Sequence, residues 1–186
     1  MSYRILLTGA QGTGKSTLTR AIASSFENAG VADVSAFVGV GQQVALSGRA
    51  TGAQADLETV QMFVDLHRRR EATAAGSILI FDRCLLDALA YAQVLQCLPR
   101  NDLEALRVAT VESSKRAAQL LWLRVTHDYP VNKPEDETPE FRRTIDAAIG
   151  QLARANGLHL QEHAVPPQSF ADIAQDVFAT WQDKKA

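Results

Sequence analysis

Residues 9–17 carry the residue types that would hold the phosphates of a nucleotide. They read GAQGTGKST, which matches the pattern G-x-x-x-x-G-K-[ST] of a phosphate-binding loop. Glycines let successive backbone N–H groups turn inward around phosphate oxygens, and a helix that begins after them adds its positive N-terminal dipole. The lysine supplies charge at the β- and γ-phosphates and the serine hydroxyl is a ligand for Mg²⁺, so the pattern predicts ATP and Mg²⁺ as cofactors. The residues expected to contact the nucleotide are Gly9, Gln11, Gly12, Thr13, Gly14, Lys15, Ser16 and Thr17.

A second pair of charged residues follows the apolar run 78–82. Asp82 ends this run, Arg83 follows it, and a helix-like stretch begins immediately afterwards. Ligands of parallel sheets bind at the carboxyl ends of the strands, so we expect the pair to lie beside the phosphate-binding loop. There Asp82 would join Ser16 in holding Mg²⁺ or accept the proton of an attacking hydroxyl, and Arg83 would bind phosphate oxygens. The alternatives are a helix N-cap with an ion pair for Asp82 and an ordinary surface position for Arg83.

The elements that must position these residues follow from the hydrophobic pattern. Short apolar runs alternate with longer amphipathic stretches, which is typical of an α/β domain with a parallel sheet. The predicted strands are 5–8, 34–38, 78–82, 120–125 and 158–161. The predicted helices are 15–29, 54–75, 85–98, 101–119, 140–156 and 169–181. We expect one domain over residues 1–186, with a lid segment at about 126–143 whose polar part contains three prolines.

The two motifs together resemble those of P-loop nucleoside and nucleotide kinases, especially thymidylate-kinase-like enzymes. The element DRYxxSxxAY of those enzymes aligns with residues 82–91, which read DRCLLDALAY. The chain is still more similar to small AAA-like ATP-binding domains related to ribosylnicotinamide kinase. The resemblance implies a three-layer P-loop NTPase fold whose five-stranded parallel sheet has the order 2-3-1-4-5. It also implies transfer of the γ-phosphoryl group of ATP to a small acceptor.

The sequence departs from these kinases on the acceptor side. Many relatives carry an acidic residue after the second strand that binds or deprotonates the acceptor hydroxyl, whereas residues 37–43 read FVGVGQQ. The general-base role therefore falls on Asp82 or on no residue, since a loose transition state needs little base catalysis. Cys84 and Asp87 replace the Tyr and Ser of the thymidylate-kinase element, which weakens the case for dTMP. The expected acceptor is a nucleoside, a nucleotide or a similar ring-bearing alcohol.

Three residues around the expected lid are candidates for catalysis or acceptor binding. Kinases of this architecture bring lid arginines to the phosphates on closure, which makes Arg142 and Arg143 catalytic candidates. Consecutive helix residues face different directions, so we expect only one of the two to reach inward. For each, the alternative is an ion pair with nearby acidic residues. Asp128 either orients the acceptor or lies in a surface loop.

Three further residues are candidates for the acceptor pocket. Gln61 lies on the apolar face that Leu57, Val60 and Val64 form, and it either pairs with a nucleobase edge or is a partly exposed helix residue. Phe37 and Phe63 either stack on an acceptor ring or belong to the core. The run 68–70, RRR, is either a solvated helix face or a phosphate or nucleic-acid contact.

Composition limits the setting and the partners. The 186 residues carry a net charge of −2 and are 46 % apolar, which is typical of a globular protein and disfavours a nucleic-acid coat. No apolar run approaches the roughly 18 residues of a membrane span, so we expect no membrane partner. The two cysteines are too few for a disulfide framework and indicate a cytoplasmic setting. The sequence leaves a homodimer open.

Other function classes remain as alternatives. One alternative acceptor is a hydroxymethylated base in DNA, which the arginine run 68–70 is able to contact. A regulatory GTPase is disfavoured because residues 132–135, NKPE, lie in a proline-rich loop and no switch motif follows the third strand. An ATPase motor is a poor match, and a nucleotide-binding module without an acceptor remains open.

For the phosphate-binding loop itself, the alternative is a glycine-rich turn without a ligand. Thr17 is either a phosphate contact or a first-turn helix residue.

Overall fold

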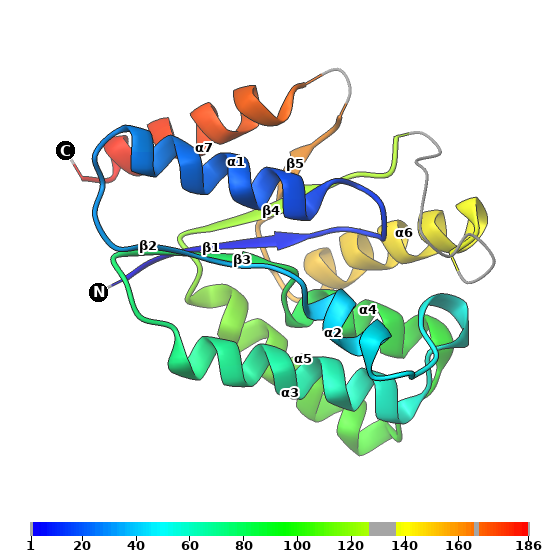
Figure 1. The fold of residues 1–186 in the computed structure, drawn as a ribbon. Coiled ribbons are helices and arrows are strands. Elements are labelled where there is room, and N and C mark those ends of the chain that lie inside the picture. The colour runs from blue at the N-terminus through cyan, green and yellow to red at the C-terminus, as the bar shows by residue number, and fades with distance from the viewer. Residues whose placement is uncertain (1, 127–136, 166–167, 186) are drawn as a thin grey trace.

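Five parallel strands form the central sheet, in the spatial order β2-β3-β1-β4-β5 (Figure 1). The computed structural model describes residues 2–126, 137–165 and 168–185. Its strands are β1 (Tyr3–Thr8), β2 (Val34–Phe37), β3 (Ile78–Asp82), β4 (Gln119–Leu123) and β5 (Gln161–His163). Every residue of β3 and β4 is buried, as expected for parallel strands that are covered on both faces. The predicted α/β class is confirmed, and so is the strand order that the kinase resemblance implied.

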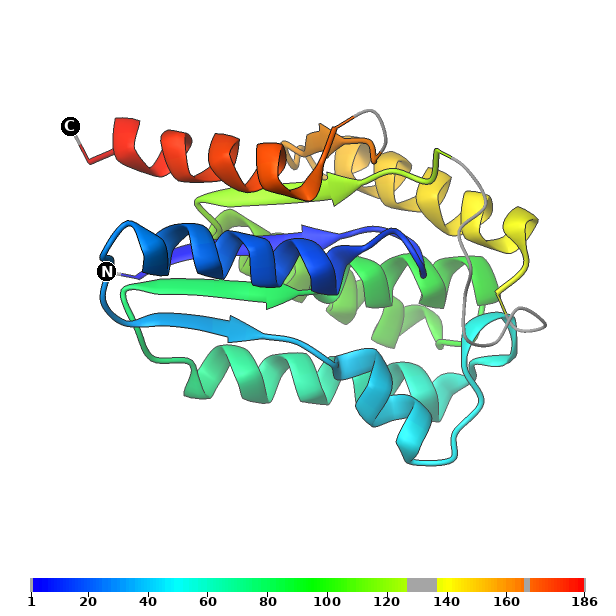
Figure 2. The ribbon, with the colours of Figure 1, turned by 45° about the horizontal axis from the view of Figure 1, so that its top comes forward.

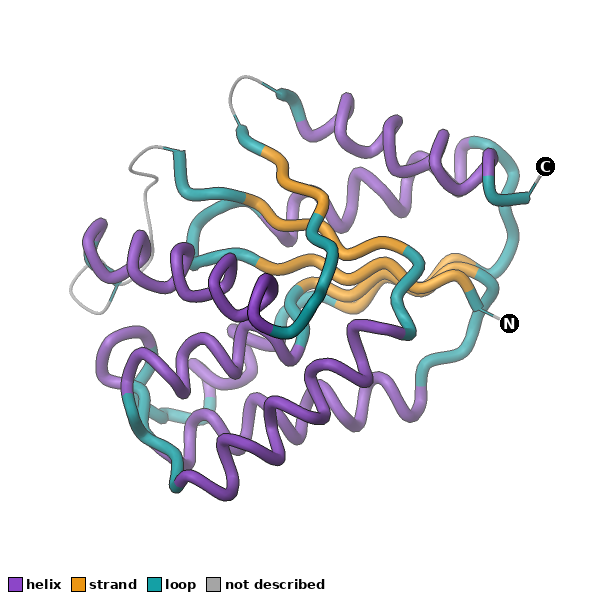
Figure 3. Tube along the Cα trace, turned by 180° about the vertical axis from the view of Figure 1, so that it is seen from behind, coloured by secondary structure: helices purple, strands orange, loops and turns teal. Residues whose placement is uncertain are grey.

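Helices cover both faces of the sheet and complete three layers (Figure 2). On one face, α1 packs against α7. The larger set of helices, which includes the packed pairs α3 with α4 and α4 with α6, lies on the other face, as the view from behind shows (Figure 3). The long helices of the two faces together are α1 (Lys15–Asn28), α3 (Leu57–Thr73), α4 (Leu85–Leu95), α5 (Arg100–Lys115), α6 (Pro139–Ala155) and α7 (Phe170–Asp183). Within the described ranges, no helix has both the length and the apolar character to cross a bilayer.

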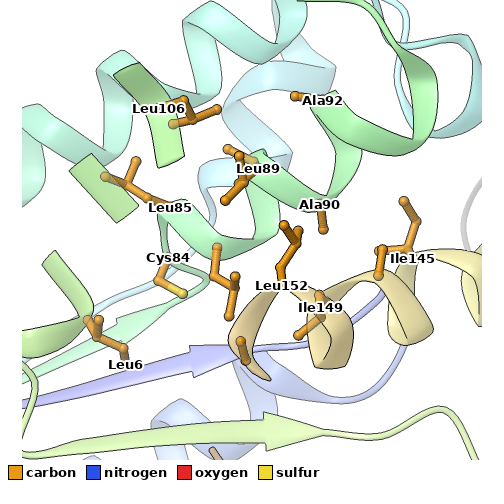
Figure 4. Close-up of a cluster of buried hydrophobic side chains, with 14 of the residues drawn as sticks. Leu6, Cys84, Leu85, Leu89, Ala90, Ala92, Leu106, Ile145, Ile149 and Leu152 are labelled. Carbon is orange, nitrogen blue, oxygen red and sulfur yellow. The ribbon is translucent and has the colours of Figure 1, made fainter. Parts of the chain in front are cut away.

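Alternate residues of each strand serve two separate cores. In β1, Ile5 and Leu7 pack with α1 and α7, whereas Leu6 belongs to the cluster on the opposite face. Successive side chains of a strand point to opposite faces, which explains the division. The second cluster joins the sheet to α4, α5 and α6 through residues such as Leu89 and Ile149 (Figure 4). Both cores hold the carboxyl ends of β1 and β3 in a fixed relation, and the candidate site lies at those ends.

Three elements differ from the sequence prediction. The short helix α2 (Val40–Leu46) and the 3-10 turn η1 (Gly52–Gln54) lie between the predicted strand 34–38 and the predicted helix 54–75, and of their residues only Gln54 was assigned to an element. The last strand lies at Gln161–His163 rather than at 158–161. The shift arises because Gly157, with a φ of 63°, ends α6 and the backbone N–H of Leu158 donates to the carbonyl of Ala153. The residues just after Gly157 therefore close the helix before the chain joins the sheet.

Candidate active site

The predicted phosphate-binding loop connects the end of β1 to the start of α1. Gly9 and Gly14 have φ values of 146° and 87°, a region that side chains rarely adopt. Close packing also requires glycine at both positions. A Cβ on Gly9 would lie 2.5 Å from the carbonyl oxygen of Leu123, and one on Gly14 would lie 2.3 Å from the ring of Phe170. The loop is thus held between β4 and α7, with its last residue capping α1.

Lys15 lies almost entirely inside this loop, 5 % exposed. Its Nζ donates hydrogen bonds to the carbonyl oxygens of Gly9 and Ala10, at 2.7 and 2.6 Å. Burial, followed by the nearby charge of Arg83, lowers the pKa of Lys15 to about 8. The amine is therefore positioned at the centre of the loop and retains its charge below that pH.

Ser16 and Asp82 meet across the gap between α1 and β3. The Ser16 hydroxyl donates a hydrogen bond to a carboxylate oxygen of Asp82. Hydroxyl and carboxylate oxygens are the donors that Mg²⁺ prefers, so this pair fits the cation that the motif implies. No group of three or more His, Cys, Asp or Glu side chains suited to a metal occurs among the residues that the structure describes. Mg²⁺ at this site would therefore need further oxygens from phosphates or water.

Arg83 is held in an unusual backbone conformation beside the loop. Its φ is 74°, and such a left-handed conformation costs a residue other than glycine about 1–3 kcal/mol. Its guanidinium donates to the side-chain oxygen of Gln11 and to the carboxylate of Asp87, the latter at 3.4 Å. The strained backbone and the two partners together fix the direction of a cation next to the phosphate-binding loop.

Asp87 is a site residue that the sequence analysis noted only as a departure from the kinase element. It is fully buried, and its carboxylate accepts hydrogen bonds from the backbone N–H groups of Cys84 and Gly9, at 3.0 and 3.3 Å. It thereby ties the start of α4 and Arg83 to the first residue of the loop. The signal that points to this role is the spacing of a capping box, with Cys84 in the position that serine usually takes.

Glu137 is a second residue that the sequence analysis did not select. It is 8 % exposed, and its carboxylate oxygen Oε1 accepts a hydrogen bond from the Tyr91 hydroxyl at 3.1 Å. Burial raises the pKa of Glu137, while the charge of Arg83 opposes that effect. Glu137 lies in the polar, acidic run 135–140, a composition typical of solvated residues. No local sequence pattern distinguishes it from the other acidic residues of that run.

A cavity of about 480 Å³ joins these groups. The phosphate side is formed by the loop and the start of α1, together with Asp82 and Arg83. The opposite wall comes from α2, the region of η1 and the start of α3. The expected nucleotide contacts that line the cavity are Gln11, Gly12, Gly14, Lys15, Ser16 and Thr17. Gly9 and Thr13 are not part of the lining, and the Thr13 hydroxyl instead donates to the carbonyl of Ala10 at 3.1 Å.

Two of the expected acceptor contacts lie elsewhere. Gln61 is exposed on α3 and does not line the cavity, because Val60 and Phe63 occupy the inward face of that helix. Phe37 stacks on Phe81, with ring centroids 4.8 Å apart and an angle of 11° between the rings, and belongs to the core. Phe63, by contrast, does line the cavity, and the guanidinium of Arg83 lies 5.9 Å from its ring centroid.

Arg142 and Arg143, the two lid candidates, face in different directions, as expected for consecutive residues of a helix. Arg142 is 1 % exposed and lies near enough to Glu137 for its charge to lower the pKa of that carboxyl. Arg143 is exposed and lies 3.8 Å from the carboxylate of Glu140. Neither arginine lines the cavity. Asp128 and the prolines of the expected lid before residue 137 lie outside the described residues.

A model of the AAA domain matches residues 4–172. The chain belongs to the AAA domain family. No curated protein matches this AAA-domain chain in sequence.

Solved structures share the fold of this AAA domain at low sequence identity. The NadR protein in complex with NR is 15 % identical, with a TM-score of 0.72, and the match covers 96 % of this chain and 51 % of that one. The NadR protein in complex with NAD and AMP-PNP gives 16 % identity and a TM-score of 0.71, covering 96 % and 49 %. Thymidylate kinase from Ehrlichia chaffeensis is 17 % identical, with a TM-score of 0.67, and the match covers 97 % of this chain and 98 % of that one. The AAA domain thus spans about half of NadR and nearly all of the thymidylate kinase.

Proposed function

We propose that this AAA-domain protein is a P-loop kinase that transfers the γ-phosphoryl group of ATP to a nucleoside, a nucleotide or a related alcohol. The observation that carries the proposal is the cavity that joins the phosphate-binding loop and the Asp82–Arg83 pair to a wall formed by α2, the region of η1 and the start of α3. A kinase needs both halves in one cavity, because the acceptor oxygen and the γ-phosphate must meet in line. A nucleotide-binding module without an acceptor needs only the first half.

Each charged residue of the phosphate side has a role in this proposal. Bound Mg²⁺ would neutralise charge on the phosphates, and Ser16 and Asp82 are the residues that would hold it. Lys15 binds the β- and γ-phosphate oxygens with the amine that the free protein directs to its own loop carbonyls. Arg83 stabilises charge on the transferring group, and Gln11 and Asp87 hold its guanidinium in place.

We assign the lid to about residues 126–143, with Arg142 as the arginine that approaches the phosphates when the lid closes. The burial of Arg142 near Glu137 supports this choice over Arg143, which is exposed. The two free cysteines, Cys84 and Cys97, favour a cytoplasmic setting for the reaction. A homodimer stays a prediction.

Structures with this fold are consistent with such an activity, since one is a thymidylate kinase and another contains AMP-PNP. The direct test is ADP formation by the purified protein with ATP and Mg²⁺, measured alone and with a panel of acceptors. We expect slow turnover with ATP alone and at least about tenfold acceleration by the correct acceptor. Turnover that is equally fast with and without every acceptor would instead indicate an ATPase.

A further inference from the structure

Two glycines lie inside α-helices of the described chain, and close packing explains only one of them. A Cβ on Gly150 in α6 would lie 2.5 Å from the ring of Trp122, so α6 approaches β4 this closely only with glycine at that position. A Cβ on Gly41 in α2 would lie 3.7 Å from Nε of Arg83, an ordinary van der Waals distance. Outside its own helix and its chain neighbours, that Cβ would meet no other described atom within 4 Å. Packing therefore does not require glycine at position 41.

The backbone of Gly41 does not require glycine either. The residue lies in the first turn of α2 with helical angles and not with a positive φ. Alanine adopts these angles without strain, and it leaves the unfolded chain with less conformational entropy to lose on folding. Glycine is thus the less stabilising residue at this position. A function for the space that the missing side chain leaves would account for it.

The space beside Gly41 belongs to the candidate cavity. Gly41, Phe63 and Arg83 all line that cavity, and the guanidinium of Arg83 lies 5.9 Å from the centroid of the Phe63 ring. The point that a Cβ of residue 41 would occupy is 3.7 Å from Nε of Arg83. An atom of a bound molecule at this point would therefore contact the side chain that we expect to bind the transferring group.

Arg83 has little freedom to move away from this space. Its guanidinium donates to the carboxylate of Asp87 at 3.4 Å and to the side-chain oxygen of Gln11. Asp87 is itself fully buried, and it accepts further hydrogen bonds from two backbone N–H groups. A side chain at position 41 would therefore take its volume from the cavity, because the guanidinium beside it is fixed.

We propose that Gly41 is a specificity-determining residue, and that the acceptor lies directly against the backbone of α2 at Gly41 with its reacting oxygen beside Arg83. This inference rests on the kinase function proposed above, and it names the wall of the cavity that selects the acceptor. The glycine admits the part of the acceptor next to the reacting oxygen, whereas any side chain at this position would exclude it.

The first experiment finds an acceptor for the wild-type protein. ADP formation with ATP and Mg²⁺ is measured in the presence of the common ribonucleosides, the deoxyribonucleosides and their 5′-monophosphates. The compound that accelerates ADP formation most is then used with the variants. If none of these compounds accelerates it, the kinase function fails and this inference fails with it.

Gly41→Ala and Gly41→Val fill the space in two steps. We expect kcat/KM for the acceptor to fall at least about tenfold in Gly41→Ala and further in Gly41→Val, while the KM for ATP stays within about twofold of wild type. The urea midpoint of Gly41→Ala should equal or exceed that of wild type, because alanine suits the helix. Gln43→Ala is the matched control and should have wild-type kinetics, since Gln43 is exposed on the same helix and does not line the cavity.

Four outcomes would overturn the role of Gly41 and leave the kinase function standing. The first is a wild-type kcat/KM for the acceptor in both Gly41 variants, and the second is an equal loss in Gln43→Ala. The third is a rise in the KM for ATP as large as the loss for the acceptor, which would assign the space to the nucleotide. The fourth is a lowered urea midpoint in Gly41→Ala, which would make the glycine a structural residue. Should Gly41→Val fail to fold, Gly41→Ala decides alone.

Discussion

The Ser16 hydroxyl donates a hydrogen bond to the Asp82 carboxylate, and this contact joins the first turn of α1 to the last residue of β3. β1 and β3 are neighbours in the sheet, so their carboxyl ends bring the loop and the acidic residue to one point. The hydroxyl and carboxylate oxygens together form a small oxygen-rich site that suits Mg²⁺. The role of this contact can be separated from simple helix capping.

Asp82→Asn keeps the shape of the side chain and removes its negative charge. If Asp82 helps to hold Mg²⁺, phosphoryl transfer falls at least about 100-fold and the Mg²⁺ concentration for half-maximal rate rises. Initial rates over a Mg²⁺ titration measure both effects, and urea unfolding checks that the fold is retained. Asp65→Asn, at an exposed position of α3, is the control. A wild-type rate of phosphoryl transfer in Asp82→Asn would show that Asp82 has only a structural role.

Lys15→Ala removes the one full positive charge inside the loop. Charge-assisted hydrogen bonds contribute about 1.5–3 kcal/mol each, so the Kd for ATP should rise at least about tenfold. Calorimetric titration with a non-hydrolysable ATP analogue measures the change without turnover. The comparison variant Lys115→Ala alters an exposed lysine at the end of α5 and should bind like wild type. Unchanged binding in Lys15→Ala would contradict the assigned phosphate site.

The lowered pKa of Lys15 predicts how nucleotide binding depends on pH. With a pKa of about 8, the amine of the free protein loses its proton as pH rises through that value. Phosphates favour the charged amine, so ATP affinity should be full below pH 8 and fall above it, by up to about tenfold per pH unit. Binding near pH 8.5 should take up protons, which calorimetry in buffers of different ionisation enthalpy detects. Lys15→Ala should lose this proton uptake, and a wild-type affinity that stays constant from pH 7 to 9 would rule out the coupling.

Local patterns in the sequence were sufficient to predict that the loop and the Asp82–Arg83 pair lie at one cavity. The loop from Gly9 to Ser16 is contiguous, and Asp82 and Arg83 end a strand whose apolar pattern is clear. A parallel sheet then brings these separate segments together, because both follow the carboxyl ends of neighbouring strands. The order of the strands followed from the family resemblance rather than from any single segment.

The acceptor side depends on tertiary packing, which local patterns do not encode. The glycine-rich stretch before residue 53 gave no helical signal, yet α2 forms there because Val40 and Val44 are buried and the helix packs on α3. Gln61 lies next to residues that face inward, and the exact rotation of α3 decided that it is exposed. Glu137 reaches the cavity lining through tertiary packing, and its hydrogen-bond partner Tyr91 lies 46 positions earlier in the chain.

His67 provides a pH-dependent contribution to stability. It is 1 % exposed on α3, and burial, followed by the charges of Arg70 and Arg83, lowers its pKa to about 3. The unfolded chain takes up the proton near pH 6.5 and the folded chain does not, so stability is full above pH 6.5 and falls as pH drops toward 3. The slope approaches about 1.4 kcal/mol per pH unit within that window. Urea unfolding at several pH values should show this slope reduced in His67→Leu and unchanged in His159→Asn, an exposed position. Equal slopes in wild type and His67→Leu would contradict the assignment.

Gly14→Ala tests whether the loop is held by backbone conformation alone or also by close packing. Gly14 and Gly30 have similar φ values, 87° and 75°, so alanine meets comparable backbone strain at both positions, about 1 kcal/mol. A Cβ on Gly30 meets no atom within 4 Å, whereas one on Gly14 lies 2.3 Å from the Phe170 ring. Gly30→Ala should therefore lose about 1 kcal/mol of unfolding free energy, and Gly14→Ala more. Phe170→Ala in the Gly14→Ala background removes the ring and should recover part of that difference, measured against Phe170→Ala alone. Equal losses of unfolding free energy at the two glycines would show that the Phe170 ring moves aside without measurable cost and that the loop tolerates a wider separation from α7.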